Sequence, residues 1–515
     1  MGATSDLKPS GRATRALVLL TVLMAVVFRL YHLDAKSLWL DEITQVSLAR
    51  LGIPLFFWQL AFYSGVPLDY LVQMSLLGLG LSEYAVRFHA AWFGILTVPL
   101  LYITGRALSQ RATTGPIAAA LLALFPFHIQ YSQEARPYAL FCFLELLAFY
   151  CAWRGTIKDD RRAWWGYALA TIGAFNTHYF AALFTVPIGF AVAWLAAQLR
   201  ATPRSALILI VRFLASLAAA LFSWNLMPWL GIALVSGQRV LGLAPAPDWP
   251  APFYHAALPT ILLSLQAQLL LTGKFGWLMG GLLGLGLIRL ARHRPAAAAF
   301  SVAWLVLPTL ISALAFMPRG LPLQPRFIIP VLPVYLILVA EGVTAVAQIG
   351  KAVAPRFRRG EPVLATAIVV VLLFFVGART RAYYAWPKES WREAMQAVAR
   401  YAHPRDAIVV PHMEEVLGIY APSIHHTLWE PKTLAEVQAV ARQRGRLWLI
   451  WSPYNEMGAQ NAAALLDWLR REGAAEFVGK NGVRVFLWQS DLSPARMRAL
   501  AAGLYVPPPL TLATP

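Results

Sequence analysis

Long apolar segments constrain this chain more than any other feature of its sequence. Eleven runs are long enough, as helices, to cross the hydrocarbon core of a bilayer: 16–33, 88–106, 114–131, 137–153, 163–176, 179–198, 205–223, 274–290, 297–316, 326–345 and 362–378. Hydrophobic residues make up 58% of the 515 residues and charged residues only 13%, which excludes a single soluble domain. The predicted fold class is a polytopic α-helical membrane protein with about 11 transmembrane helices.

The placement of the positive charge indicates a topology. The formal net charge is +19, but residues 379–515 hold 16 Lys and Arg against 12 Asp and Glu, so most of the excess lies among the apolar runs. The basic residues collect in alternate loops, for example at Arg12, Arg106, Arg161, Arg200, Arg292 and Arg358. Such loops face the cytoplasm, so we expect a multi-pass protein of the cell (inner) membrane with a cytoplasmic N-terminus. A nucleic-acid partner is not expected, because the charge marks topology.

The last part of the chain differs in character from the rest. Helical patterns alternate there with short strand-like runs, the helices at 391–401, 433–444 and 459–471 and the strands at 406–410, 446–451 and 483–488. We therefore predict two domains, a transmembrane domain over 1–378 and a small α/β domain over 379–515. With eleven crossings, the second domain lies on the extracytoplasmic (periplasmic) face, as does the loop 34–87.

Two apolar runs, 66–80 and 256–272, are predicted to lie along the membrane surface or to be partly re-entrant. Counting 66–80 as a crossing would invert every later loop and place the basic clusters outside. Between the two runs, the aromatic segment 224–255 is predicted to be a loop that closes over a bound substrate, and its alternative is an interfacial aromatic belt.

Two polar segments interrupt the apolar runs, at 37–42 and at 131–138. Ionisable groups at membrane depth are costly, so such groups at the ends of spans are candidates for chemistry. Asp41 and Glu42 are adjacent and would point about 100° apart on a helix, so they would not share one proton. Asp41 is a candidate general base toward a hydroxyl or an amine, and the alternative is an interfacial helix cap.

Further polar residues recur at the same ends of later spans. Glu134 and Arg136 precede Pro137, where Arg136 would neutralise an anion or pair with Glu134, and the alternative is a structural salt bridge. His178 and Arg326 also lie where spans open outward; taken singly, each is explained by packing or by snorkelling to the interface. Several such groups on one face are better explained together by a cavity.

Several of these segments resemble the ordered signature of polyprenyl-phosphate-dependent glycosyltransferases of the GT-C fold, in the bacterial branch related to protein O-mannosyltransferases and the lipid A aminoarabinose transferase. The resemblance extends over about residues 16–380. It rests on Ser37-Leu38-Trp39-Leu40-Asp41-Glu42, Pro67-Leu68-Asp69-Tyr70, Ser82-Glu83-Tyr84-Ala85-Val86-Arg87, Tyr131-Ser132-Gln133-Glu134-Ala135-Arg136-Pro137-Tyr138, Asn176-Thr177-His178-Tyr179-Phe180 and Arg326-Phe327-Ile328-Ile329-Pro330.

The resemblance implies an inverting glycosyltransferase that moves a hexosyl or pentosyl group from a polyprenyl phosphate (undecaprenyl or dolichyl type) to a protein, lipid or polysaccharide acceptor of the cell envelope. The predicted catalytic residues are Asp41, Glu42 and Glu134. The predicted donor-phosphate and substrate-binding residues are Arg136, Tyr138, His178, Tyr179, Gln324 and Arg326. A lipid-phosphate-linked sugar is the donor substrate; no cofactor is required by this chemistry, and a divalent metal is left open.

Two other classes of protein remain as alternatives. A transporter would use charges at mid-depth and internal repeats, whereas here the charges gather at span ends and no repeat is evident. A membrane-anchored cell-envelope assembly or binding protein would use the α/β domain for binding, but that role leaves the segments around Asp41 and Arg136 unexplained.

Overall fold

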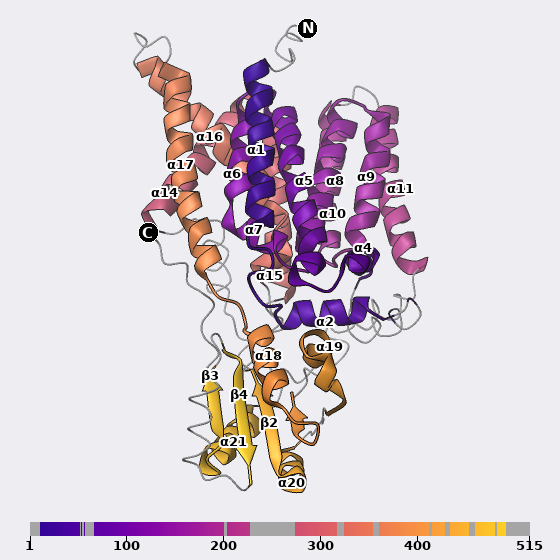
Figure 1. The fold of residues 1–515 in the computed structure, drawn as a ribbon. Helices are drawn as coiled ribbons and strands as arrows, with labels where there is room; N and C mark the ends of the chain where they lie inside the picture. The colour runs from indigo at the N-terminus through magenta and orange to yellow at the C-terminus, as the bar shows by residue number, and fades with distance from the viewer. Residues whose placement is uncertain are drawn as a thin grey trace.

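The computed structural model describes residues 11–51, 53, 56, 66–199, 203–226, 273–316, 324–353, 360–410, 415–427, 433–452, 459–478 and 482–490. A bundle of long helices forms one body, and a smaller domain with a β-sheet lies beyond one of its ends (Figure 1). The helix α2 (Leu40–Ala49) lies across the bundle axis between the two (Figure 1). Most of the expected aromatic loop 224–255 and the whole run 256–272 lie outside the described residues.

The long helices follow the apolar runs of the sequence. They are α1 (Arg12–Leu30), α5 (Glu83–Ser109), α6 (Thr114–Leu124), α7 (Pro126–Ser132), α8 (Tyr138–Ile157), α9 (Arg161–Phe175), α10 (Ala181–Leu199), α11 (Pro203–Leu226), α14 (Gly273–His293), α15 (Pro295–Phe316), α16 (Val331–Val353) and α17 (Gly360–Ala385). Among the described residues, seven helices are long and apolar enough to cross a membrane. The polytopic helical fold is therefore confirmed, and the number of eleven crossings stays a prediction.

The predicted span 114–131 is not one continuous helix, because Pro126 divides it into α6 and α7. Proline lacks a backbone N–H and restricts the residue before it to extended conformations, so the carbonyls that end α6 lose their helical donors. The guanidinium of Arg29, which is fully buried, donates to two of them, at Leu122 (3.2 Å) and Ala123 (3.1 Å), and contacts His128 Nδ1 at 2.8 Å. A buried arginine thus supplies the donors that the break removes.

Charged residues also lie inside the bundle, whereas the sequence pattern predicts them at the ends of the spans. Arg289 of α14 forms an ion pair with Glu341 of α16, and Thr114 of α6 donates to the same carboxylate at 2.5 Å. Glu341 is fully buried, so this pair joins three helices where unpaired charges would be costly. The pair lies on helices other than α2, which carries Asp41, and apart from the turn between α7 and α8 that carries Arg136.

Shorter helices line the end of the bundle that faces the smaller domain. The run 66–80 forms α4 (Leu68–Leu76) and a 3-10 turn (Leu77–Leu79), which are too short to cross the hydrocarbon. Another 3-10 turn (Pro325–Ile328) precedes α16 and carries Arg326.

The C-terminal domain is an α/β domain, as its sequence pattern predicts. It contains α18 (Trp391–Tyr401), β1 (Ala407–Val409), α19 (Glu415–Tyr420), a 3-10 helix (Pro422–Thr427), α20 (Leu434–Arg444), β2 (Arg446–Trp451), α21 (Ala459–Arg471), β3 (Ala475–Val478) and β4 (Arg484–Gln489). The sheet order is β1-β2-β4-β3, with β1 and β2 parallel and the other pairs antiparallel. The strand β3 was not predicted.

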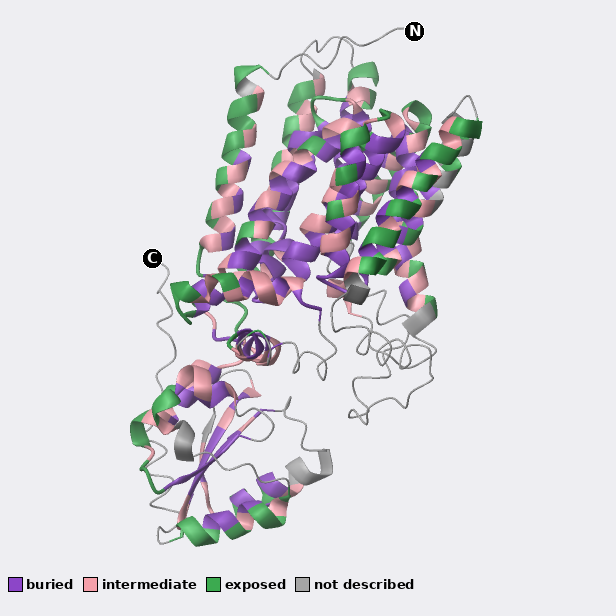
Figure 2. Cartoon of the chain, turned by 90° about the vertical axis from the view of Figure 1, so that its right-hand side faces the viewer, coloured by how far each residue is buried: buried purple, intermediate pink, exposed green. Residues whose placement is uncertain are grey.

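Both faces of this sheet are buried, as Figure 2 shows by the buried strands between flanking helices. Alternate residues of one strand point to opposite faces. Trp448 and Ile450 of β2 therefore share a core with α18, α19 and the buried face of α2, whereas Leu447 and Leu449 pack with α20 and α21. One face of the C-terminal sheet thus joins the core that holds α2 in place.

Candidate active site

The site is built around the first turn of α2. The helix begins after Trp39, and the Glu42 carboxylate accepts the backbone N–H of Trp39 at 3.3 Å, which closes the first turn. Carboxylates at this position are also favoured by the helix dipole. The local sequence therefore explains why Asp41 and Glu42 lie at the start of a helix. The contacts that each side chain makes with other segments indicate that the two carboxylates have different roles.

Glu42 is fully buried and its carboxylate is surrounded by donors. Arg87 of α5 binds both oxygens at 2.7 Å, the backbone N–H of Ala135 donates at 2.8 Å, and the Lys388 ammonium lies 3.5 Å away. Burial by itself would raise the pKa of Glu42, but Arg87, Lys388 and these hydrogen bonds lower it to about 2. Such a carboxylate is suited to holding α2 against the segment at Ala135.

Asp41 is 27% exposed and faces two guanidinium groups. Its Oδ2 atom lies 3.7 Å from Nη2 of Arg136 and 3.5 Å from Nη2 of Arg326. The two arginines come from widely separated parts of the sequence, so the fold brings together three of the predicted site residues. Because Asp41 keeps access to solvent and Glu42 does not, Asp41 is the carboxylate of this pair that a substrate can reach.

Neighbouring groups fix the positions of both guanidinium groups. Arg136 donates through Nη1 to the backbone oxygen of Asp41 (3.2 Å) and to Oε1 of Gln45 (3.3 Å). The Arg326 guanidinium lies over the rings of Trp39 (5.3 Å) and Tyr138 (5.5 Å). The Nε atoms of both arginines have no hydrogen-bond partner within the described part of the chain. Two oriented guanidinium groups on one carboxylate oxygen form a suitable site for an anion.

Glu134 does not pair with Arg136, which was one of the two roles considered for that arginine. Its carboxylate instead lies 3.2 Å from the ammonium of Lys388. The contact between Glu134 and Arg136 is a backbone hydrogen bond, in which the N–H of Arg136 donates to the carbonyl oxygen of Glu134. The side chain of Glu134 is buried. The negatively charged partner of Arg136 is thus the substrate-accessible Asp41, and Glu134 belongs with Glu42 to a buried pair of carboxylates around Lys388.

The remaining predicted residues lie around Tyr138. His178 packs between aromatic rings, with centroids 4.9 Å from Phe141 and 5.7 Å from Tyr138, and its Nδ1 accepts the backbone N–H of Phe180 at 3.2 Å. Burial and the two arginines lower the pKa of His178 to about 3, so the ring is neutral. Tyr179 is 41% exposed, and Gln324 precedes the turn that carries Arg326.

A buried polar group behind Arg136 was not predicted. The amide of Gln45 donates to Oδ2 of Asp69 at 2.5 Å, and the same oxygen lies 3.4 Å from Nε2 of His89. Gln45 follows Asp41 by one helical turn, so the i, i+4 rule could have identified it. Lys388 was not among the predicted site residues, because its contacts with Glu42 and Glu134 depend on how the linker after α17 folds back.

The donor set of the site favours an anionic ligand. Among the described residues, no three His, Cys, Asp or Glu side chains lie close enough to hold a metal ion. A carboxylate that binds a metal ion is accompanied by further oxygen ligands, whereas Asp41 is flanked by two arginines. This arrangement can bind a phosphate while leaving one carboxylate beside it.

Comparisons with known proteins identify a family that matches part of the chain. Residues 51–236, which include Arg136 and His178, match the family described as dolichyl-phosphate-mannose-protein mannosyltransferase. No curated protein matches the chain by sequence.

Solved structures share the fold. ArnT from Cupriavidus metallidurans in the apo state has a TM-score of 0.56 at 14% identity, with 93% of this chain and 99% of that chain covered. The same enzyme bound to undecaprenyl phosphate has a TM-score of 0.53 at 16% identity, covering 92% and 98%. The oligosaccharyltransferase AglB from Archaeoglobus fulgidus, in complex with an inhibitory peptide and a dolichol-phosphate, has a TM-score of 0.53 at 12% identity, covering 92% and 74%. The resemblance drawn from the sequence is confirmed: the chain has the GT-C fold of these membrane enzymes, and part of it matches a mannosyltransferase family.

Proposed function

We propose that the protein transfers a sugar from a polyprenyl phosphate to an acceptor hydroxyl or amine, with inversion at the anomeric carbon. The observation that supports this proposal most strongly is the position of Asp41 between Arg136 and Arg326, at 3.7 and 3.5 Å. A donor of this kind leaves as a lipid monophosphate, so the enzyme needs cations at the phosphate and one base near the acceptor.

Each residue then has a defined step. The acceptor oxygen or nitrogen attacks the anomeric carbon, the bond from that carbon to the phosphate oxygen breaks, and its electron pair leaves with the lipid phosphate. Asp41 takes the proton of the acceptor, and the guanidinium groups of Arg136 and Arg326 stabilise the developing phosphate charge. In this proposal Glu42 and Glu134 hold the segments that carry these groups, and Tyr138 and His178 support the arginines.

The orientation follows from the basic loops. The site lies at the end of the bundle that carries α2 and the C-terminal domain (Figure 1). The positive-inside rule places the opposite end in the cytoplasm, so we propose that transfer occurs on the extracytoplasmic face. Undecaprenyl phosphate and dolichol phosphate, the lipids bound by the similar structures, define the class of donor carrier that we expect here.

The phosphate-binding role is tested by Arg326→Lys and Arg136→Lys. A planar guanidinium binds phosphate oxygens in a fork that an ammonium does not reproduce, so both variants should bind polyprenyl phosphate more weakly although charge is kept. Arg136→Lys should also lose turnover, since Arg136 contacts Asp41 and Gln45. Arg470→Lys, at an exposed pair on α21, is the matched control. Binding is measured by titration with undecaprenyl phosphate, and unchanged affinity in both site variants would contradict the role.

A further inference from the structure

The linker between α17 and α18 passes directly behind the site. Lys388 in this linker places its ammonium 3.5 Å from the carboxylate of Glu42 and 3.2 Å from that of Glu134. Glu42 adjoins the candidate base Asp41, and Glu134 lies two residues before Arg136. One side chain from the entrance of the C-terminal domain therefore joins the two segments that carry the base and a phosphate ligand.

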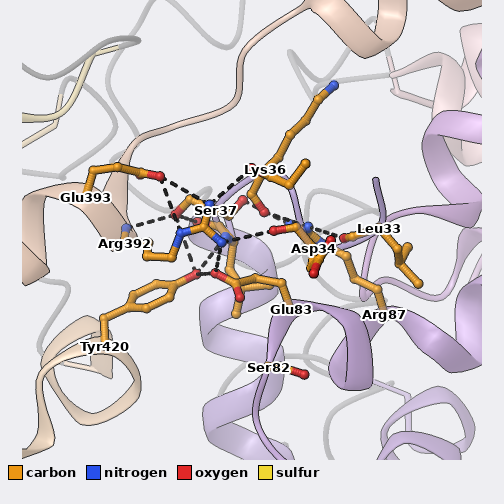
Figure 3. Close-up of polar contacts among 12 residues, drawn as sticks. Leu33, Asp34, Lys36, Ser37, Ser82, Glu83, Arg87, Arg392, Glu393 and Tyr420 are labelled. Carbon is orange, nitrogen blue, oxygen red and sulfur yellow. Dashed lines mark hydrogen bonds and ion pairs between the residues drawn. The ribbon is translucent and has the colours of Figure 1, made fainter. Parts of the chain in front are cut away.

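Arg392 at the start of α18 holds the loop that leads into α2, as Figure 3 shows. Its guanidinium donates to the backbone oxygens of Asp34 (3.0 Å) and Ala35 (3.1 Å) and binds the Glu83 carboxylate at 3.0 Å. Its backbone N–H donates to Oγ of Ser37 at 3.0 Å. These contacts fix the loop at Asp34, Ala35 and Ser37 and connect it to the start of α5.

Tyr420 of α19 reaches the same loop from a different element of the C-terminal domain (Figure 3). Its hydroxyl oxygen accepts the backbone N–H of Leu38 at 2.8 Å and donates to Oε1 of Glu83 at 3.1 Å. Leu38 lies two residues before α2 begins. A single hydroxyl thus satisfies a backbone donor next to the turn that presents Asp41.

Apolar packing supports the same connection. Leu38, Ile43 and Val46 are fully buried in a core that also contains Trp391 of α18 and Val416 of α19. A tethered binding module would meet the bundle through a more polar, separable interface. Here the inner face of α2 is covered by the C-terminal domain, so the helix is part of that domain's core.

We propose that Lys388, Arg392 and Tyr420 are positioning residues for Asp41, and that the C-terminal domain is a structural part of the active site. The inference rests on the proposed role of Asp41 as the base. Loosening these contacts moves Asp41 relative to the acceptor while Arg326, held by Trp39 and Tyr138, still binds phosphate. The consequence is a loss of turnover that exceeds any loss of donor-lipid affinity.

The test uses Tyr420→Phe in the full-length protein, with Tyr401→Phe as the matched control. Tyr420→Phe keeps the apolar packing but leaves the N–H of Leu38 without its acceptor, and Tyr401 is a partly exposed tyrosine of the same domain. Turnover is followed as consumption of polyprenyl-phosphate-linked sugar in membranes, and affinity by titration with undecaprenyl phosphate. Thermal unfolding in detergent reports folding.

We expect Tyr420→Phe to lower turnover by about 5- to 100-fold, the range that corresponds to one unmade buried hydrogen bond, with affinity within about twofold of the wild type. Tyr401→Phe should match the wild type. Lys388→Met should lose turnover in the same way, and Lys388→Arg, which keeps the charge, should retain most of it.

Two results would overturn the inference: wild-type turnover in folded Tyr420→Phe and Lys388→Met, or losses that follow affinity and folded fraction alone. Failure of the proposed function gives a different result, because the wild-type protein itself would then leave polyprenyl-phosphate sugars unconsumed.

Discussion

The buried ion pair between Glu42 and Arg87 allows a prediction of stability. In Glu42→Gln, the carboxamide fits the same space but removes the negative charge that faces both nitrogens of the Arg87 fork at 2.7 Å. Both side chains are at most 2% exposed, so solvent cannot replace the lost partner. We expect a large destabilisation and a slower enzyme, because Glu42 also holds the backbone at Ala135.

Two estimates of the magnitude agree. Removal of one partner from a buried pair costs about 3–5 kcal/mol. The fall in the pKa of Glu42 from 4.5 to about 2 corresponds to about 3 kcal/mol, at roughly 1.4 kcal/mol per pH unit. Because the folded-state pKa is the lower one, this stabilisation is complete above pH 4.5 and is lost as the pH falls toward about 2.

The assay is thermal unfolding of the purified protein in detergent at neutral pH. We expect the midpoint of Glu42→Gln to fall by about 3–5 °C. The matched control is Glu361→Gln, because Glu361 pairs with Lys351 at an exposed site whose loss should cost about 0–1 kcal/mol. Equal midpoints for the wild type and Glu42→Gln would refute the claim that the charge of Glu42 stabilises the packing of α2 against α5.

Two further predictions concern the bundle and its orientation. A Cβ added at Gly342 of α16 would overlap the backbone of Leu282, so Gly342→Ala should unfold at a lower temperature than the wild type, whereas Gly281→Ala, with open space around it, should not. A reporter that is active only outside the cytoplasm should work when fused after Pro515 and fail when fused after Lys158, and the reverse pattern would overturn the topology.

Periodicity and length were enough to predict much of this fold. The apolar runs predicted long helices, and the short continuous apolar run at 446–451 predicted β2, because a strand buried on both faces is apolar at successive positions. Asp41, Arg136 and Arg326 were predicted because charged residues beside apolar spans are rare. That both arginines lie beside the same oxygen of Asp41 depends on the tertiary structure, and it cannot be read from positions so far apart in the sequence.

Other features depend on contacts between distant segments. Pro126 indicates a break in the third run, but only the structure shows that Arg29 supplies donors to the freed carbonyls. Lys388 lies in a polar linker with no periodic pattern, and its role follows from the return of the chain to Glu42 and Glu134. The short strand β3, which pairs with β4 at the edge of the described sheet, has four residues, and these carry too little pattern to predict it.

The most direct test of the central claim is the rate of sugar transfer by Asp41→Asn, measured as consumption of polyprenyl-phosphate-linked sugar beside the wild-type protein. Asparagine keeps the shape of the side chain but cannot take the acceptor proton. The account predicts a loss of about 10²- to 10⁴-fold in turnover, with undecaprenyl phosphate still bound by Arg136 and Arg326. Transfer at the wild-type rate by folded Asp41→Asn would contradict the assignment of Asp41 as the base.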